Sequence, residues 1–281
     1  MLSYRHGFHA GNHADVLKHF VLVRLLLHLT RKDKALWVID THAGAGCYSL
    51  DSGFAAKNAE YATGIGRLWS REDLPAPLAD YVDQVRAVNR DGALRSYPGS
   101  PQIALQLTRD IDRLRLFELH TNEGKALREY FSGAGRRVAV VAGDGFAGLR
   151  AVLPPPSRRG LVLIDPSYET TSDYHAVPAA IRDALERFAT GTYAVWYPQV
   201  PRRESQGLPD RLRRLAPGDW LHVALTVRKP ATDGFGLHGS GMFVFNPPWN
   251  LESDVRAAMP VLVQALGQDD HAKYDLQFRQ T

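Results

Sequence analysis

The chain has 281 residues, 44% of them hydrophobic and 23% charged, which is the size and composition of an ordinary globular protein. Its single cysteine, Cys47, excludes an internal disulfide and a metal site built from several cysteines, and it favours a reducing compartment. The formal net charge of +4 is compatible with a polyanionic partner but does not require one.

The first predicted element is a helix over residues 15–29, where apolar side chains recur at helical spacing. Its most apolar part, residues 20–29, contains Arg24 and His28 and is shorter than the roughly 20 residues of a membrane helix. We therefore expect a buried helix and no contact with a membrane. The N-terminus lacks the basic-then-apolar pattern of an export signal, so we expect a cytoplasmic protein.

Seven short apolar runs predict β-strands, and helical patterns lie between most of them. This alternation is typical of βαβ units, so the sequence predicts an α/β, Rossmann-like fold: a seven-stranded, mostly parallel sheet with helices on both faces. The runs cover residues 35–40, 114–119, 138–142, 161–165, 193–197, 221–227 and 242–245. The residues after Gly267 read as a polar, irregular tail.

A polar stretch between the first two predicted strands contains a helical pattern at 78–88 and no strand-like run. We interpret residues 48–97 as a small helical insertion subdomain. Residues 1–47 then supply the N-terminal segment, helix, first strand and glycine-rich loop, and residues 98–281 supply the remainder of the same domain.

The glycine-rich loop is Asp40-Thr-His-Ala-Gly-Ala-Gly46, directly after the first predicted strand. Glycines at the carboxyl end of a strand let the backbone approach a ligand closely. The dinucleotide fingerprint GxGxxG is absent, whereas Gly44 and Gly46 with an acidic residue at the strand end resemble the first motif of S-adenosylmethionine-dependent enzymes. A purely structural turn, or a dinucleotide-dependent oxidoreductase, is the alternative.

Acidic residues also end the next two predicted strands. Glu118 could accept hydrogen bonds from a ribose diol, although it lies much farther from Asp40 than the roughly 20 positions expected without an insertion. Asp144, followed by Gly145 and Phe146, could hold an adenine amino group beside a flat ring. A solvated glutamate and an ordinary Asp-Gly turn remain alternatives.

The segment Asp165-Pro166-Ser167-Tyr168 follows a predicted strand and resembles the DPPY tetrad of amino-methyltransferases, with Ser167 in place of the second proline. An exocyclic base amine is a poor nucleophile because its lone pair is delocalised into the ring. The Asp165 carboxylate and the Pro166 carbonyl could accept its two N–H groups and orient the nitrogen. Tyr168 could stack on a base flipped out of its helix. A structural proline turn is the alternative.

Four histidines, His6, His9, His13 and His19, crowd the N-terminal segment. The HExxH pattern is absent and such spacing is nonspecific, so we expect no metal. Lys18 and His19 are placed to meet the carboxylate of a methyl donor, with a surface lysine as the alternative. Basic clusters could bind phosphates or be solvated surface; they lie at residues 158–159, 202–203, 211–214 and 228–229.

Six segments together closely resemble the bacterial RlmJ family, whose members methylate adenine N6 in 23S ribosomal RNA. They are residues 4–19, 40–46, 97–101, 118–120, 157–160 and 239–249. The resemblance implies a class I methyltransferase fold, S-adenosyl-L-methionine as the donor and no metal. It also implies large-subunit ribosomal RNA as the partner, in a protein-free or early assembly form, and we expect a monomer.

The resemblance also implies roles for individual residues. Asp165, Pro166 and Tyr168 would form the catalytic turn, with Tyr4 and His6 nearby on the N-terminal segment. The donor site would comprise Lys18, His19, His42, Gly44, Gly46, Ser100, Glu118, Asp144, Gly145 and Asp165. Two alternatives stay open: a DNA adenine-N6 methyltransferase, and a non-catalytic RNA-binding protein with a degenerate methyltransferase fold, to which Ser167 gives some support.

Overall fold

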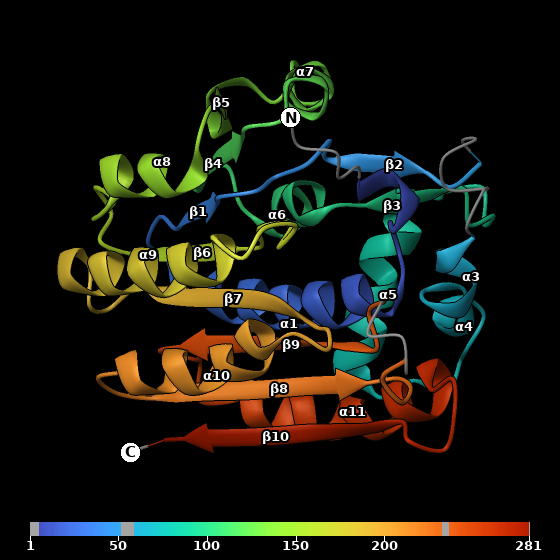
Figure 1. Cartoon of the computed structure of the whole chain (residues 1–281). Helices are drawn as coiled ribbons and strands as arrows, with labels where there is room; N and C mark the ends of the chain where they lie inside the picture. Colours follow the sequence, from blue (N-terminus) through green and yellow to red (C-terminus); the bar gives the residue numbers. More distant parts are fainter. Residues whose placement is uncertain (1–5, 52–58, 232–235, 281) are drawn as a thin grey trace.

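The computed structural model describes residues 6–51, 59–231 and 236–280. In these ranges the chain is built around a sheet of eight strands in the order β10-β8-β9-β7-β6-β1-β4-β5 (Figure 1). The strands are β1 (Trp37–Asp40), β4 (Arg113–Glu118), β5 (Val138–Ala142), β6 (Gly160–Ile164), β7 (Thr192–Gln199), β8 (Trp220–Thr226), β9 (Gly239–Phe245) and β10 (Lys273–Arg279).

Six of these strands run in the same direction. From β5 to β7 all neighbours are parallel, whereas β9 is antiparallel to both β7 and β8. Strand β8 therefore runs with the parallel set, and the arrows of β9 and β10 point the opposite way in Figure 1. The predicted α/β, Rossmann-like fold with a mostly parallel sheet is confirmed, and the carboxyl ends of six strands meet at one edge.

The eighth strand corrects the prediction of seven strands followed by an irregular tail. Strand β10 pairs with β8 along its full length, from Lys273 opposite Thr226 to Arg279 opposite Trp220. It is an edge strand whose side chains are mostly exposed, and only Tyr274 and Leu276 are partly buried against the core. Such a strand has no continuous apolar run, which is why its sequence resembles a polar tail.

Helices cover both faces of the sheet because successive strand residues point to opposite sides. On β1, Val38 belongs to one apolar core and Ile39 to the other. The first face carries α1 (His13–Leu29), α5 (Ala76–Ala87), α6 (Ser100–Leu107), α7 (Thr121–Tyr130) and α11 (Leu251–Leu266), and the second carries α8 (Gly145–Val152), α9 (Asp173–Arg187) and α10 (Arg203–Leu215).

Helix α1 is buried on all sides over residues 13–26. It begins at Asn12, whose side chain accepts hydrogen bonds from the backbone N–H groups of Ala14 and Asp15, both at 3.0 Å. It packs against β9, α5, α6 and α11. The guanidinium group of Arg24, on α1, forms ion pairs with Asp80 of α5 and with Asp254 of α11. The predicted buried helix is thus the centre of one helical layer.

The region predicted as an insertion contains α3 (Glu60–Thr63), α4 (Gly66–Trp69) and α5. At its two ends β2 (Cys47–Ser49) pairs antiparallel with β3 (Ser96–Pro98), so the prediction that this stretch has no strand is wrong at its borders. The short pairing has little apolar signal because each strand has only three residues. Helix α5 packs against α1 and α11. The division into domains stays a prediction.

Two short 3-10 helices, His6–Phe8 and Gly135–Arg137, complete the described elements. Among the described residues, no helix combines the length and the apolar character needed to cross a bilayer.

Candidate functional site

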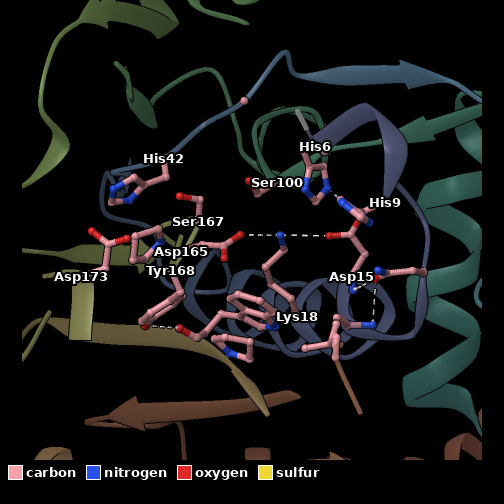
Figure 2. A pocket seen from close by; sticks show the side chains of 18 of the residues that line it. His6, His9, Asp15, Lys18, His42, Ser100, Asp165, Ser167, Tyr168 and Asp173 are labelled. Atoms are coloured by element: carbon pink, nitrogen blue, oxygen red, sulfur yellow. Dashed lines mark hydrogen bonds and ion pairs between the residues drawn. The ribbon is translucent and has the colours of Figure 1, made fainter. Parts of the chain in front are cut away.

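A cavity of about 880 Å³ opens at the carboxyl edge of the parallel strands. Loops after β1, β4, β5 and β6 line it together with α1 and the residues following β7 and β8. Figure 2 shows side chains from these elements converging on it. The predicted site residues that line it are His6, Lys18, His19, His42, Gly44, Ser100, Glu118, Asp144, Gly145, Asp165, Pro166 and Tyr168.

Two predicted residues are not placed at the cavity. Gly46 is not among the described residues that line it: its φ is +89°, and a side chain there would contact Phe131 and Tyr130 behind the loop. Its carbonyl accepts a hydrogen bond from the Gly99 N–H at 2.9 Å, so it shapes the loop from the far side. Tyr4 lies outside the described residues.

Glu118 fixes the glycine-rich loop at one end of the cavity. Its Oε2 accepts the Gly44 N–H at 2.8 Å and its Oε1 accepts the His120 N–H at 2.7 Å. A carboxylate oxygen has two lone pairs, so both atoms keep acceptor capacity toward the cavity.

The turn after β5 approaches the loop after β1 closely. A Cβ on Gly145 would lie 1.9 Å from the Thr41 carbonyl oxygen, so only glycine fits there. Asp144 caps α8 by accepting the Phe146 N–H at 2.8 Å. The rings of Phe146 and His42 meet edge to face at 5.1 Å, and burial lowers the pKa of His42 to about 4. This end of the cavity thus combines carboxylates with flat, uncharged rings.

Asp40 connects the glycine-rich loop to α6 through hydrogen bonds. Its carboxylate accepts Ser100 Oγ–H at 2.6 Å and the His42 N–H at 3.2 Å. Burial raises the pKa of Asp40 to about 6, against the effect of these two hydrogen bonds.

An array of charged side chains crosses the middle of the cavity (Figure 2). Lys18 Nζ lies 2.5 Å from Asp165 Oδ2 and 3.0 Å from Asp15 Oδ1. Asp15 Oδ2 also accepts hydrogen bonds from His6 Nε2 and from the Gly11 N–H, both at 2.9 Å. The array links the N-terminal segment, α1 and the turn after β6.

The charged groups of this array shift one another's pKa values. Burial raises the pKa of Asp165, and the adjacent Lys18 ammonium opposes that rise. Burial disfavours the ammonium of Lys18, but Asp15 and Asp165 outweigh it and raise its pKa. Burial also acts against the Asp15 carboxylate, yet His6 and Lys18 hold its pKa well below its usual range. Lys18 therefore stays protonated between two carboxylates.

The tetrad makes a tight turn beside this array. Tyr168 has a left-handed backbone, with φ of +53°, and its hydroxyl donates to the Trp196 carbonyl at 2.8 Å. Its ring lies 4.7 Å from that of Tyr174 and is only 4% exposed, so it forms part of the cavity wall. Ser167 also lines the cavity. The stacking role of Tyr168 stays a prediction.

His19 lies behind Lys18 on α1. Its Nδ1 is 2.7 Å from the Tyr97 hydroxyl, its side chain is almost fully buried, and burial lowers its pKa to about 3. It is therefore neutral near pH 7.

Several residues at the cavity were not predicted from the sequence. Asp15 had a local signal, because it stands three positions before Lys18 on one helix face. Glu60 had none: it comes from α3 and contacts His9 Nδ1 and Asn12 Nδ2, both at 3.0 Å, across a long sequence separation. The other unpredicted lining residues include Asp173 and Trp196, whereas Arg202 and Arg228, which also line the cavity, come from two of the basic clusters noted in the sequence.

The four N-terminal histidines do not share a ligand set. His6 contacts Asp15, His9 contacts Glu60 and His19 contacts Tyr97. In the described part of the chain, no group of three or more His, Cys, Asp or Glu side chains has an arrangement that could hold a metal ion.

Comparison with known proteins gives consistent matches. "Ribosomal RNA large subunit methyltransferase J" of Escherichia coli is 48% identical over 262 residues, 93% of each chain, and the protein with the same name from Haemophilus influenzae is 47% identical over 267 residues, 95% of this chain and 94% of its own. A crystal structure of a Legionella pneumophila protein superposes with a TM-score of 0.88 at 36% identity, covering 96% of this chain and 98% of the other.

The family model described as "Ribosomal RNA large subunit methyltransferase D, RlmJ" matches residues 33–279. This match confirms the resemblance expected from the sequence, and the chain therefore belongs to the RlmJ family.

Proposed function

We propose that this chain transfers a methyl group from S-adenosyl-L-methionine to the exocyclic N6 amine of an adenine in 23S ribosomal RNA. One observation carries the chemistry: the Asp165-Pro166 turn and the loop containing Gly44 line the same cavity. An amine held at the turn can then face a donor seated over the loop. Membership of the RlmJ family supports the choice of ribosomal RNA.

The residues at the glycine-loop end of the cavity fit a sulfonium nucleoside. Glu118 keeps acceptor lone pairs suited to a ribose diol, and Asp144 lies beside the ring of Phe146, where a flat base and its amino group can bind. Because only glycine fits at position 145, the turn after β5 packs directly against the backbone of the loop after β1, which brings both loops to this end of the cavity. A cavity of about 880 Å³ has room for a cofactor and a nucleobase. When bound, the donor supplies a methyl group on a positively charged sulfur, which is both electrophile and leaving group.

The turn after β6 supplies what the amine needs. The Asp165 carboxylate and the Pro166 carbonyl accept its two N–H groups and direct the nitrogen lone pair toward the methyl group. As the nitrogen forms its new bond it becomes more acidic, and Asp165 can then take the proton. Asp165 must be ionised for both tasks.

Lys18 acts on Asp165 in this proposal. Its ammonium is held between Asp165 and Asp15, so it keeps the buried Asp165 ionised and fixes the carboxylate in place. The proposal also keeps the predicted contact between Lys18 and the carboxylate of the donor. An ammonium group has three N–H donors, and because Asp15 and Asp165 accept two of them, the third is left for the donor.

The test is Asp165→Asn, which keeps the shape of the side chain and removes its charge. We expect methyl transfer from radiolabelled donor to 23S ribosomal RNA to fall by about 10²- to 10⁴-fold, while donor binding by equilibrium dialysis is retained. Asp183→Asn is the matched control, because Asp183 lies on α9 in a surface ion pair with Arg187. Full activity of Asp165→Asn contradicts the proposal.

The alternatives give different results in the same assay. A dinucleotide-dependent oxidoreductase binds a nicotinamide cofactor in preference to the sulfonium donor. A DNA adenine-N6 methyltransferase labels DNA instead of RNA, and a degenerate RNA-binding protein retains RNA without labelling it. Mass-spectrometric mapping of the labelled RNA identifies the modified base.

We also propose that the substrate is protein-free RNA or an early assembly form, and that the enzyme acts as a monomer in the cytoplasm. Labelling of protein-free 23S RNA should exceed labelling of assembled large subunits. Light scattering should give the mass of one chain; a stable dimer would contradict this part of the proposal.

A further inference from the structure

The four basic clusters of the sequence lie in different parts of the structure, and only some of their residues line the cavity. Arg159, just before β6, donates to the backbone carbonyls of Leu29 and Lys34. It therefore lies at the amino end of the strand, at the opposite edge of the sheet from the cavity. Its neighbour Arg158 is at the same edge. The cluster at 158–159 thus supports the fold and does not face the cavity.

The cluster on α10 is also bound within the fold. Arg211 donates to the Glu204 carbonyl at 2.9 Å. Arg213 pairs with Asp210 at 3.0 Å, and its guanidinium lies 5.2 Å from the centre of the Trp220 ring. The third member, Arg214, is exposed and does not line the cavity.

Two arginines from the remaining clusters do line the cavity, Arg202 and Arg228. Arg202 follows the end of β7 and Arg228 follows the end of β8, and both strands run toward the cavity edge. In the sheet order they lie on one side of β6, whereas the loop with Gly44 and the acidic residues after β4 and β5 lie on the other. The Asp165 turn therefore stands between a glycine-loop half and an arginine half.

The charges of the two halves differ. The glycine-loop half carries the carboxylates of Glu118, Glu123 and Asp144, while Glu60 on α3 and Asp173 on α9 line other parts of the cavity. The lysines and arginines that line the cavity are Lys18, Arg202 and Arg228, and Lys18 is already held between two carboxylates. Over residues 6–51, 59–231 and 236–280, neither Arg202 nor Arg228 is in an ion pair with a carboxylate. Among the described residues, the arginine side therefore offers phosphates two cations that are not held by carboxylates, whereas the glycine-loop side offers them none.

The two arginines are held in position differently. Arg228 donates to the Leu237 carbonyl at 3.2 Å, which holds its guanidinium against the start of β9. Arg202 is exposed beside Tyr174, whose ring contacts that of Tyr168 in the catalytic turn. Pro198 and Val200 supply apolar surface on the same side of the cavity. The arginine half thus offers two cations around an apolar wall, which suits a nucleoside with its flanking phosphates.

We propose that Arg202 and Arg228 bind the backbone phosphates on either side of the target nucleotide as its base enters the cavity, an inference that rests on the proposed function. A guanidinium group can bind a phosphate through two parallel hydrogen bonds. Such contacts fix the register of the nucleotide over the Asp165 turn and do not choose the sequence.

The experiment compares Arg202→Gln and Arg228→Gln with Arg214→Gln, which makes the same charge change outside the cavity. Methyl transfer to protein-free 23S RNA is measured over a series of salt concentrations, and RNA binding is measured in parallel. We expect each cavity variant to lower kcat/KM by about tenfold, through KM, and to reduce the slope of log(kcat/KM) against log[salt] by about one unit. Donor binding should be unchanged in all variants.

Arg202→Gln is the decisive variant, because Arg202 is exposed and its loss does not threaten folding. Arg202→Lys keeps the charge and should retain the salt slope. Unchanged KM and salt slope in Arg202→Gln, or an equal effect in Arg214→Gln, overturns the inference while leaving the methyltransferase proposal intact. If the wild-type protein labels no RNA, the proposed function fails. The salt dependence of RNA binding then still decides whether the arginines contact phosphates.

Discussion

Lys18 Nζ lies 2.5 Å from Asp165 Oδ2, so the catalytic carboxylate of the proposed reaction is in direct contact with a buried ammonium. The ammonium is shared with Asp15 on the same helix, at 3.0 Å. Since burial alone raises the pKa of Asp165, this contact keeps the carboxylate available as an acceptor.

Lys18→Met should therefore shift the pH dependence of methyl transfer. Without the ammonium, the pKa of Asp165 rises further, and the acid side of the rate profile should move upward by about one pH unit or more. The variant also leaves Asp15 and Asp165 buried without their cation, which should cost about 3–5 kcal/mol of unfolding free energy. Single-turnover rates at several pH values and denaturant unfolding check both effects; an unshifted acid limb contradicts the role assigned to Lys18.

Gly145→Ala should disrupt the donor end of the cavity, because the new Cβ would lie 1.9 Å from the Thr41 carbonyl oxygen and the backbone must shift. We expect donor affinity, measured by calorimetry, to fall by at least about tenfold. Gly207→Ala is the matched control inside α10: nothing lies within 4 Å of its Cβ, and it should stabilise the protein by about 0.5–1 kcal/mol. Equal donor affinity in the two variants would rule out this account.

Acid should destabilise the protein partly through His222, a buried residue on β8 whose Nε2 lies 2.7 Å from the Tyr197 hydroxyl. Burial lowers the pKa of His222 from 6.5 to about 4. Between these two pH values His222 is therefore protonated in the unfolded chain and neutral in the folded chain, so acid favours unfolding. Stability from this group is present above pH 6.5 and is lost on acidification toward pH 4, by about 1.4 kcal/mol per pH unit.

His222→Gln should make the fall in unfolding free energy over this window shallower, as followed by urea titrations at pH 7, 6 and 5. His271→Gln, at an exposed position before β10, is the control and should leave the fall unchanged. The same slope in both variants would show that His222 titrates alike in the folded and unfolded states.

Glu60 should control the charge of His9. Its hydrogen bond to His9 Nδ1 raises the pKa of that histidine, against the effect of burial. Glu60→Gln should therefore lower the pKa of His9, measured by NMR titration of its ring protons. The pKa of His222, which lies on β8, serves as the internal reference. A higher His9 pKa in the variant would reverse the assigned cause.

The sequence predicted the helices and strands correctly where burial requires a clear run or pattern of apolar residues. Strand β6 is buried at every position and helix α1 over fourteen, so both gave strong apolar signals. Strand β10 did not, because one of its faces is exposed and it lies at the sheet edge. The glycine-rich loop and the acidic strand ends were found because a strand end combined with glycine or a carboxylate is a local signal.

The charged array could not be read from local patterns alone. Lys18 meets Asp165 across a separation of 147 positions, and that contact exists only once α1 packs along the sheet. Gly46 shows the converse: the GxG pattern is local, but the fold places Gly46 against Phe131 and Tyr130, away from the residues that line the cavity. Strand order also decides which residues lie in each half of the cavity, because it places Arg202 and Arg228 on one side of β6.

The central position of α1 has a consequence for biosynthesis. This helix precedes the strands of the sheet in the sequence and is buried on every side over residues 13–26, and β9 and α11, which pack on it, come much later. The apolar side chains of α1 therefore stay partly uncovered on the ribosome until β9 and α11 have been synthesised. The nascent protein should therefore depend on chaperones until these elements are available to cover α1.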